Sequence, residues 1–171
     1  MTKKIIFKER QKFNQWWIWP FFVLTTGLFL YGSIQQIIYK IPFGDNSTSD
    51  SGLIFGTIAI SSISALFFVF RLETNITEEA ISVRFFPLHL NFRKYLWTEI
   101  ETAEVRKYKP LLEYGGYGIR GFGNNRAFNI SGNKGLQLVF KDGRKLLIGT
   151  QKGLEMIEIL NSQPLKNKNV K

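Results

Sequence analysis

Two long apolar segments dominate the pattern of hydrophobic and polar positions in the first half of the chain. Residues 53–70, LIFGTIAISSISALFFVF, run for eighteen positions without a charge and are followed by Arg71. At about 1.5 Å per residue, a helix of this length approaches the ~30 Å hydrocarbon core of a bilayer. Residues 16–34 form a similar apolar run after a short basic N-terminus. The pattern therefore predicts two membrane-spanning helices, over about residues 16–38 and 52–70.

After Arg71 the apolar positions change to the two-residue period of β-strands. Ile81, Val83 and Phe85 alternate with polar neighbours, which is typical of a half-buried strand. Asp142-Gly143 is a strong hairpin signal. The seven predicted strands cover residues 72–76, 80–86, 91–97, 103–108, 126–130, 136–140 and 145–148. The last pattern is amphipathic and predicts one helix over residues 151–162.

Together these elements predict an α+β protein. A two-helix transmembrane hairpin is followed by a seven-stranded, antiparallel, bent sheet or barrel that a C-terminal helix caps, as in a pleckstrin-homology (PH) domain. The expected regions are a basic cytoplasmic N-terminus (1–15), the hairpin (16–70), a cytoplasmic PH-like domain (71–162) and a disordered tail (163–171).

Charge predicts the orientation of the hairpin. The formal net charge is +10, and residues 1–15 carry five basic side chains against one acidic, whereas residues 40–51 carry one against two. By the positive-inside rule both termini lie in the cytoplasm and the chain is a multi-pass protein of the cell membrane. A cleaved signal peptide is the rival interpretation. Three tryptophans at the start of the run and the lack of an A-x-A site favour an uncleaved span.

Several soluble segments resemble those of bacterial PH-like membrane proteins, which carry two N-terminal spans before the domain. The resemblance covers roughly residues 15–160. It implies fold and topology, and it brings no catalytic residues. The segments that carry it are Asn75-Ile76-Thr77 with Ile81-Ser82-Val83-Arg84, Trp97–Ile100, Lys107–Pro110, Tyr114–Arg120 and Gly143–Gln151.

The most unusual soluble stretch is Tyr114–Gly123, YGGYGIRGFG, with five glycines in ten residues. Glycine permits positive φ and close backbone approach, while aromatic rings and a guanidinium offer stacking surface and planar charge. The stretch is either a partner-binding loop or a structural crossover. The candidate binding residues are Tyr114, Tyr117, Arg120 and Phe122.

Two further sets of residues are candidates for contacts. A basic patch would bind the membrane surface, although ordinary solvated strand charge explains the same residues; it comprises Arg93, Lys94, Arg106, Lys107 and Lys109. Small residues in the second span would let helices approach closely, either within the chain or in a dimer; these are Gly52, Gly56, Ser61 and Ala65.

Composition narrows the classes of function. The chain has no cysteine and a single histidine, His89, so thiolate catalysis is excluded, Cys/His metal sites are disfavoured, and no cofactor is expected. No ionisable residue lies inside either span, which argues against a pump or channel. No nucleic-acid-binding motif accompanies the basic excess.

The sequence therefore predicts a non-enzymatic integral membrane protein that presents a PH-like binding or scaffold domain at the bilayer. Its expected partners are the lipid bilayer and a protein partner or a second copy, with neither nucleic acid nor metal. The alternative is an accessory subunit of a transporter or envelope enzyme, held through its transmembrane helices.

Overall fold

The computed structural model describes residues 4–13, 15–44 and 48–162. The chain divides into two compact units: Asn14–Val69, here called the hairpin unit, and Met1–Phe13 with Phe70–Lys171, here called the β unit. The predicted tail, 163–171, lies outside the described residues. The hairpin unit is thus an insertion into the sequence of the β unit.

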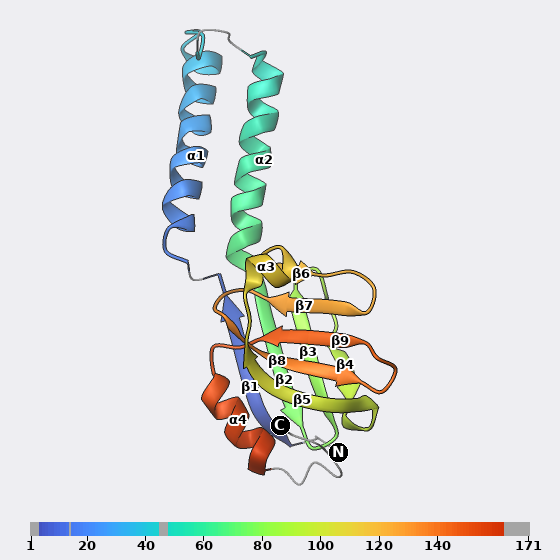
Figure 1. The fold of residues 1–171 in the computed structure, drawn as a ribbon. Coiled ribbons are helices and arrows are strands. Elements are labelled where there is room, and N and C mark those ends of the chain that lie inside the picture. Colours follow the sequence, from blue (N-terminus) through green and yellow to red (C-terminus); the bar gives the residue numbers. More distant parts are fainter. Residues whose placement is uncertain (1–3, 14, 45–47, 163–171) are drawn as a thin grey trace. The chain divides into compact units, whose positions relative to one another are not determined.

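The hairpin unit contains two apolar helices (Figure 1). Helix α1 spans Ile18–Ser33 and continues as a π-helical turn, η1, over Ile34–Ile38. Helix α2 spans Asp50–Val69. Pro20 lies in the first turn of α1, where its missing N–H leaves no helical hydrogen bond unmade. Both helices are long and apolar enough to cross a membrane, as the sequence predicts.

The β unit holds nine strands among its described residues, in two sheets. The first sheet has the order β1-β2-β3-β4, and the second has the order β5-β8-β9-β7-β6. All neighbouring strands are antiparallel except β7 and β9, which are parallel. The elements are β1 (Ile5–Lys12), β2 (Arg71–Thr77), β3 (Ala80–Phe86), β4 (Arg93–Leu96), a 3-10 turn η2 (Trp97–Glu99), β5 (Ile100–Lys107), α3 (Pro110–Tyr114), β6 (Gly118–Arg120), β7 (Asn125–Asn129), β8 (Lys134–Phe140), β9 (Lys145–Gly149) and α4 (Gly153–Ser162).

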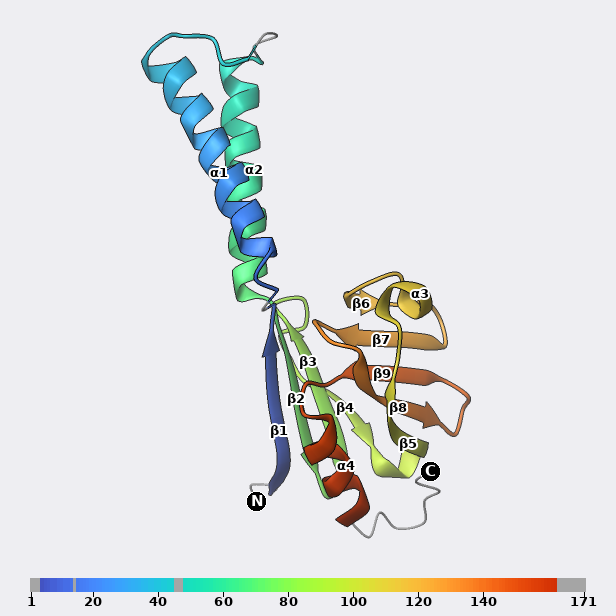
Figure 2. The ribbon, with the colours of Figure 1, turned by 60° about the vertical axis from the view of Figure 1, so that its left-hand side comes forward.

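The prediction of a single seven-stranded sheet or barrel is therefore wrong. The chain leaves β4, makes the short turn η2 and begins β5, which pairs with β8 and not with β4. The two sheets remain separate, and Figure 2 shows them facing each other. Their inner faces share one core, in which Leu72 and Val83 of the first sheet and Leu136 and Ile148 of the second are fully buried.

The sequence predicts no strand in the basic N-terminus, residues 1–15, but the structure has β1 there. Strand β1 pairs with β2 along its length, and Lys12 lies opposite Arg71. Its buried positions are Phe7, Glu9 and Gln11. Because two of the three inward side chains are polar, the strand lacks the hydrophobic alternation by which strands are recognised.

Helix α4 begins at Gly153, two residues later than predicted, and packs its apolar side on the core. Met156 and Leu160 are buried in the shared cluster. The helix contacts β1 and β5, the edge strands of the two sheets, and also β8. It therefore covers the side of the β unit at which these edges come together (Figure 2).

Candidate functional site

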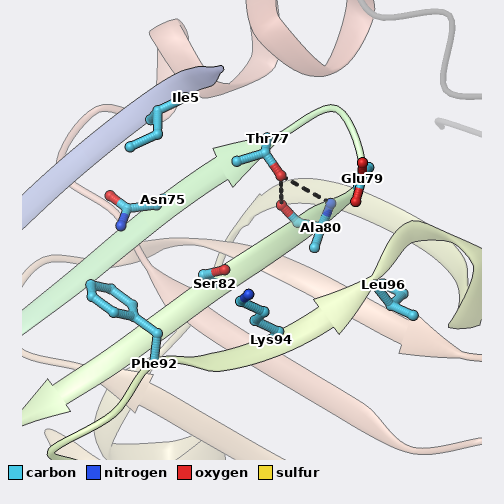
Figure 3. Close-up of a pocket in the computed structure, with 9 residues that line it drawn as sticks. All are labelled: Ile5, Asn75, Thr77, Glu79, Ala80, Ser82, Phe92, Lys94 and Leu96. Carbon is cyan, nitrogen blue, oxygen red and sulfur yellow. Dashed lines mark hydrogen bonds between the residues drawn. The ribbon is translucent and has the colours of Figure 1, made fainter. Parts of the chain in front are cut away.

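A shallow hollow of about 410 Å³ lies on the outer face of the first sheet (Figure 3). Strands β1 to β4 all contribute to it, because alternate residues of neighbouring strands point to the same face. At one end Thr77 fixes the β2–β3 turn: its hydroxyl donates to Ala80 O (3.0 Å) and accepts from Ala80 N (3.2 Å). The lining residues are Ile5, Asn75, Thr77, Glu79, Ala80, Ser82, Phe92, Lys94 and Leu96.

The hollow combines apolar walls with a few polar groups. Ile5, Phe92 and Leu96 supply apolar surface, and Lys94 supplies a cation. Asn75 Oδ1 is buried and has no hydrogen-bond partner among the described residues. The accessible features of the hollow are therefore its apolar surface and the Lys94 cation, which suit a ligand or chain segment that brings apolar surface and a negatively charged or acceptor group.

The glycine- and tyrosine-rich stretch is partly ordered by one buried side chain of β7. Asn129 is fully buried, and its Nδ2 donates to Tyr108 Oη (3.1 Å) and to Gly116 O (3.4 Å). Its Oδ1 accepts from Gly118 N (2.9 Å). Burial raises the pKa of Tyr108 to about 12, although the Asn129 hydrogen bond acts in the opposite direction. The stretch thus begins at the last residue of α3 and contains β6, which pairs with β7.

The four candidate residues of this stretch have different surroundings. Tyr114 is buried, with its ring 6.1 Å from that of Tyr108. Tyr117 Oη donates to Gly132 O (3.2 Å), and Arg120 Nε donates to Tyr117 O (2.7 Å). Phe122 is 97% exposed. Tyr114 is therefore a packing residue, Tyr117 and Arg120 brace the stretch, and Phe122 presents a free ring.

The five residues of the predicted basic patch are divided between the sheets. Arg93 and Lys94 belong to β4, whereas Arg106 and Lys107 belong to β5 and Lys109 precedes α3. Neighbouring residues of a strand face opposite sides, so Lys94 lines the hollow while the Arg93 guanidinium lies 6.0 Å from the Phe128 ring.

Arg106 is occupied by contacts within the β unit. Its guanidinium donates to Glu113 Oε2 (2.7 Å) and to Gln137 Oε1 (3.0 Å). Glu113 Oε1 also accepts from the backbone N–H of Lys109 (2.7 Å). The hydrogen bond from Arg106 and that from Lys109 lower the pKa of Glu113. Arg106 therefore holds α3 against the second sheet.

Sequence reasoning missed a second group of cations, on the first sheet. Glu73 of β2 is contacted by three arginines: Arg71 Nε at 3.1 Å, Arg10 Nε at 3.6 Å, and Arg84, whose Nε donates to it at 2.8 Å. One carboxylate balances three guanidiniums, so the group keeps a net positive charge. Arg71 and Glu73 share β2, but only the register of β1 and β3 against β2 brings Arg10 and Arg84 to the group, and β1 was not predicted.

The polar side chains of β1 join it to the end of β9. Glu9 accepts from Thr150 Oγ1 and from Gln151 N, both at 2.7 Å, and Gln11 Nε2 donates to Gly149 O at 2.6 Å. Since Glu9 and Gln11 are buried, these bonds compensate for the cost of removing the Glu9 carboxylate and Gln11 Nε2 from water, whereas Gln11 Oε1 has no hydrogen-bond partner among the described residues. Their role is to fasten β1 to the fold.

The small residues of the second span pack mainly within the chain. A Cβ added at Gly56 would lie 2.6 Å from Phe29 of α1, and one at Gly52 would lie 2.6 Å from Thr48. Ser61 is half-buried, while Ala65 is exposed. Two hydrogen bonds that no sequence pattern indicates join α1 and α2, between Ser33 Oγ and Thr57 Oγ1 (2.8 Å) and between Thr26 Oγ1 and Ser64 Oγ (3.2 Å).

His89 lies in the β3–β4 loop with its ring 5.4 Å from that of Phe128. Burial, and then the charge of Arg93, lower its pKa below the usual 6.5. Among residues 4–13, 15–44 and 48–162, no three His, Asp or Glu side chains lie close enough together to hold a metal ion.

Comparison of the chain with models of protein families and with curated proteins finds no match.

Proposed function

We propose that the chain is a non-enzymatic integral membrane protein whose helical hairpin anchors a cytoplasmic, PH-like binding domain at the bilayer surface. One observation carries the proposal: two apolar helices are inserted between β1 and β2, which are paired strands of one sheet. If the hairpin crosses the bilayer and returns, both flanking strands stay on the same side and can pair.

The exposure of the helices supports a lipid environment. Only 11% of the residues in the most apolar window of the first helix are buried, and only 6% in the second. A core helix of a soluble protein is mostly buried, and each large apolar side chain left in water forgoes about 1.5–3 kcal/mol. Phe55, Ile58 and Phe68 are examples of such exposed side chains. Lipid chains would cover them.

The fold of β1 argues against a cleaved signal peptide. Cleavage beyond α1 would remove β1 together with the first helix. The β unit would then lose Phe7 from its core and the Glu9 bonds to Thr150 and Gln151. An uncleaved span keeps the first sheet complete.

The strand order supports the PH-like part of the proposal. Without the segment from α3 to β7, the β unit consists of seven antiparallel strands in chain order and a C-terminal helix. A PH domain has the same number of strands, but the seven strands predicted from the sequence include β7, as residues 126–130, and do not include β1. Two features depart from a PH domain, since the hairpin follows the first strand and β6 and β7 extend the second sheet.

The binding function is best supported at the hollow of Figure 3, where Lys94 lies beside apolar side chains. The alternative is an accessory subunit held through its helices. It has less support, because Phe29 of the same chain already occupies the space beside Gly56.

The proposal is tested by in-cell crosslinking in native membranes that are then washed with alkaline carbonate. We expect the chain to stay in the membrane pellet. We also expect crosslinked partners of the wild type to be lost from the double variant Lys94→Glu/Leu96→Ser. The matched control is Lys141→Glu, which changes an exposed lysine of the β8–β9 turn. Release of the wild type by carbonate, or equal recovery of every partner from all three proteins, would contradict the proposal.

A further inference from the structure

Five large apolar side chains, from α3 and from two loops of the β unit, form what we call the apolar rim. They are 60% to 97% exposed. Soluble proteins expose single apolar residues routinely, but a group of them marks an interaction surface. The rim consists of Leu88, Leu90, Leu111, Leu112 and Phe122.

Contacts within the β unit bring together the three segments that carry the rim, which are the β3–β4 loop, α3 and the β6–β7 loop. The β3–β4 loop reaches β7, where the His89 ring lies 5.4 Å from Phe128. Phe128 is paired with Ile119 of β6. Gly116, between α3 and β6, accepts a hydrogen bond from Asn129 of β7. Figures 1 and 2 both show α3 and β6 at the end of the β unit where β1 ends and β2 begins.

In the sequence, this end of the β unit is connected directly to the hairpin. Arg71, the first residue of β2, follows Val69, the last residue of α2, after a single residue. Arg71 is paired with Phe86, and the rim residue Leu88 is two positions further on. Paired strands are about 5 Å apart. The rim therefore begins within a few residues' reach of the point at which the chain would leave the bilayer.

The charges around the rim match an anionic surface. The segments 87–94 and 109–126 carry five basic residues and one acidic residue, Glu113. Both carboxylate oxygens of Glu113 already accept hydrogen bonds, from Arg106 and from Lys109 N. The basic residues are Arg93, Lys109, Arg120, Arg126 and Lys94. Because Lys94 lines the hollow of Figure 3 together with Ile5, the other four are the cations that we assign to the rim.

We infer that the apolar rim inserts into the headgroup region of the bilayer that holds the hairpin, with the surrounding cations on anionic lipid. This inference depends on the proposed function and adds a second contact to it. Amphipathic surfaces bind membranes through the same combination of buried apolar area and electrostatic attraction. A protein segment fits the rim less well, because the hollow of Figure 3 includes no rim residue.

The test uses the absence of cysteine from the chain, which allows one unique label per variant. An environment-sensitive fluorophore is attached to Leu112→Cys or Phe122→Cys in the full-length protein, reconstituted into phosphatidylcholine vesicles with or without phosphatidylglycerol. The matched control is Ile5→Cys, half-exposed at the opposite end of β1 and paired there with Thr77. Ile58→Cys, in α2, reports whether the hairpin itself is inserted.

Labels at 112 and 122 should emit at shorter wavelength, and nitroxide-labelled lipid should quench them about twofold more strongly than the label at position 5. This difference in quenching should be larger when the vesicles contain phosphatidylglycerol. If position 58 is quenched while 112 and 122 behave like 5, the rim inference is wrong and the proposed anchor stands. A spectral shift at 122 without lipid quenching would also overturn it, because protein would then cover the rim. If position 58 is not quenched, the anchor and the rim both fail.

Discussion

At the scale of single residues, Gly121 has the strictest backbone requirement in the glycine-rich stretch. Its φ is +82°, and a Cβ added there would lie 2.0 Å from Asn125 O. Gly123 also has a positive φ, +59°, but a Cβ there would meet nothing within 4 Å. The two positions separate the cost of backbone conformation from the cost of a steric clash.

We therefore expect Gly121→Ala to lower the free energy of unfolding by about 2 kcal/mol more than Gly123→Ala. Both variants share the cost of a positive φ, about 1 kcal/mol, and only the first adds a clash with the backbone. Urea denaturation of the purified protein in detergent, followed by circular dichroism, measures the difference. Equal destabilisation would show that the loop relaxes away from residue 125.

The residue scale is also where prediction from sequence was least complete. The glycines and tyrosines of residues 114–123 are conspicuous in the sequence, but their roles depend on Asn129, which gives no pattern of its own. Arg10 and Arg84 reach Glu73 only through strand register. Register across separate strands is not encoded in local periodicity.

At the scale of elements, β1 decides how the chain is interpreted. Its removal from the β unit would open the first sheet and expose the core beside Phe7, which is 1% exposed. Ile5 lies on the same strand and is half-exposed. Substitutions of Phe7 and of Ile5 therefore test whether β1 belongs to the folded β unit.

We expect Phe7→Ala to destabilise the β unit by about 3–5 kcal/mol, because it leaves a cavity in the shared core. Ile5→Ala, the matched control, should cost less than about 1 kcal/mol. The same urea titration reports both. A small, equal effect of the two substitutions would mean that β1 does not pack on the core in solution.

Elements with strong local signals were predicted well. The two apolar helices, strand β3 and helix α4 lie where the hydrophobic periods indicate, within about two residues of the predicted starts. β1 and β6 were missed for physical reasons. In β1 the inward positions include Glu9 and Gln11, and β6 has three residues in a glycine-rich segment. Neither shows the alternation expected of a strand.

At the scale of the whole molecule, the sequence predicts a hairpin followed by a domain, whereas the structure has a hairpin within a domain. The sheet pairing of β1 with β2 requires the flanks of the two helices to meet. A membrane-spanning hairpin satisfies this requirement, and a single cleaved or single-pass helix does not. Arg10, Lys12 and Arg71 flank the two helices in the sequence, which is the arrangement that the positive-inside rule expects on the cytoplasmic side of the proposed hairpin.

We propose that the hairpin crosses the membrane and leaves β1 and the rest of the β unit on the cytoplasmic side. The accessibility of single cysteines in intact cells to a membrane-impermeant maleimide tests this topology. Suitable sites are Lys4→Cys before β1, Ser51→Cys near the start of α2 and Asp142→Cys in the β8–β9 turn, all three exposed. We predict that only position 51 is labelled in intact cells, and that positions 4 and 142 both react after permeabilisation. Labelling of position 4 without position 142, or of 142 without 4, would place β1 and the rest of the β unit on opposite sides and contradict it.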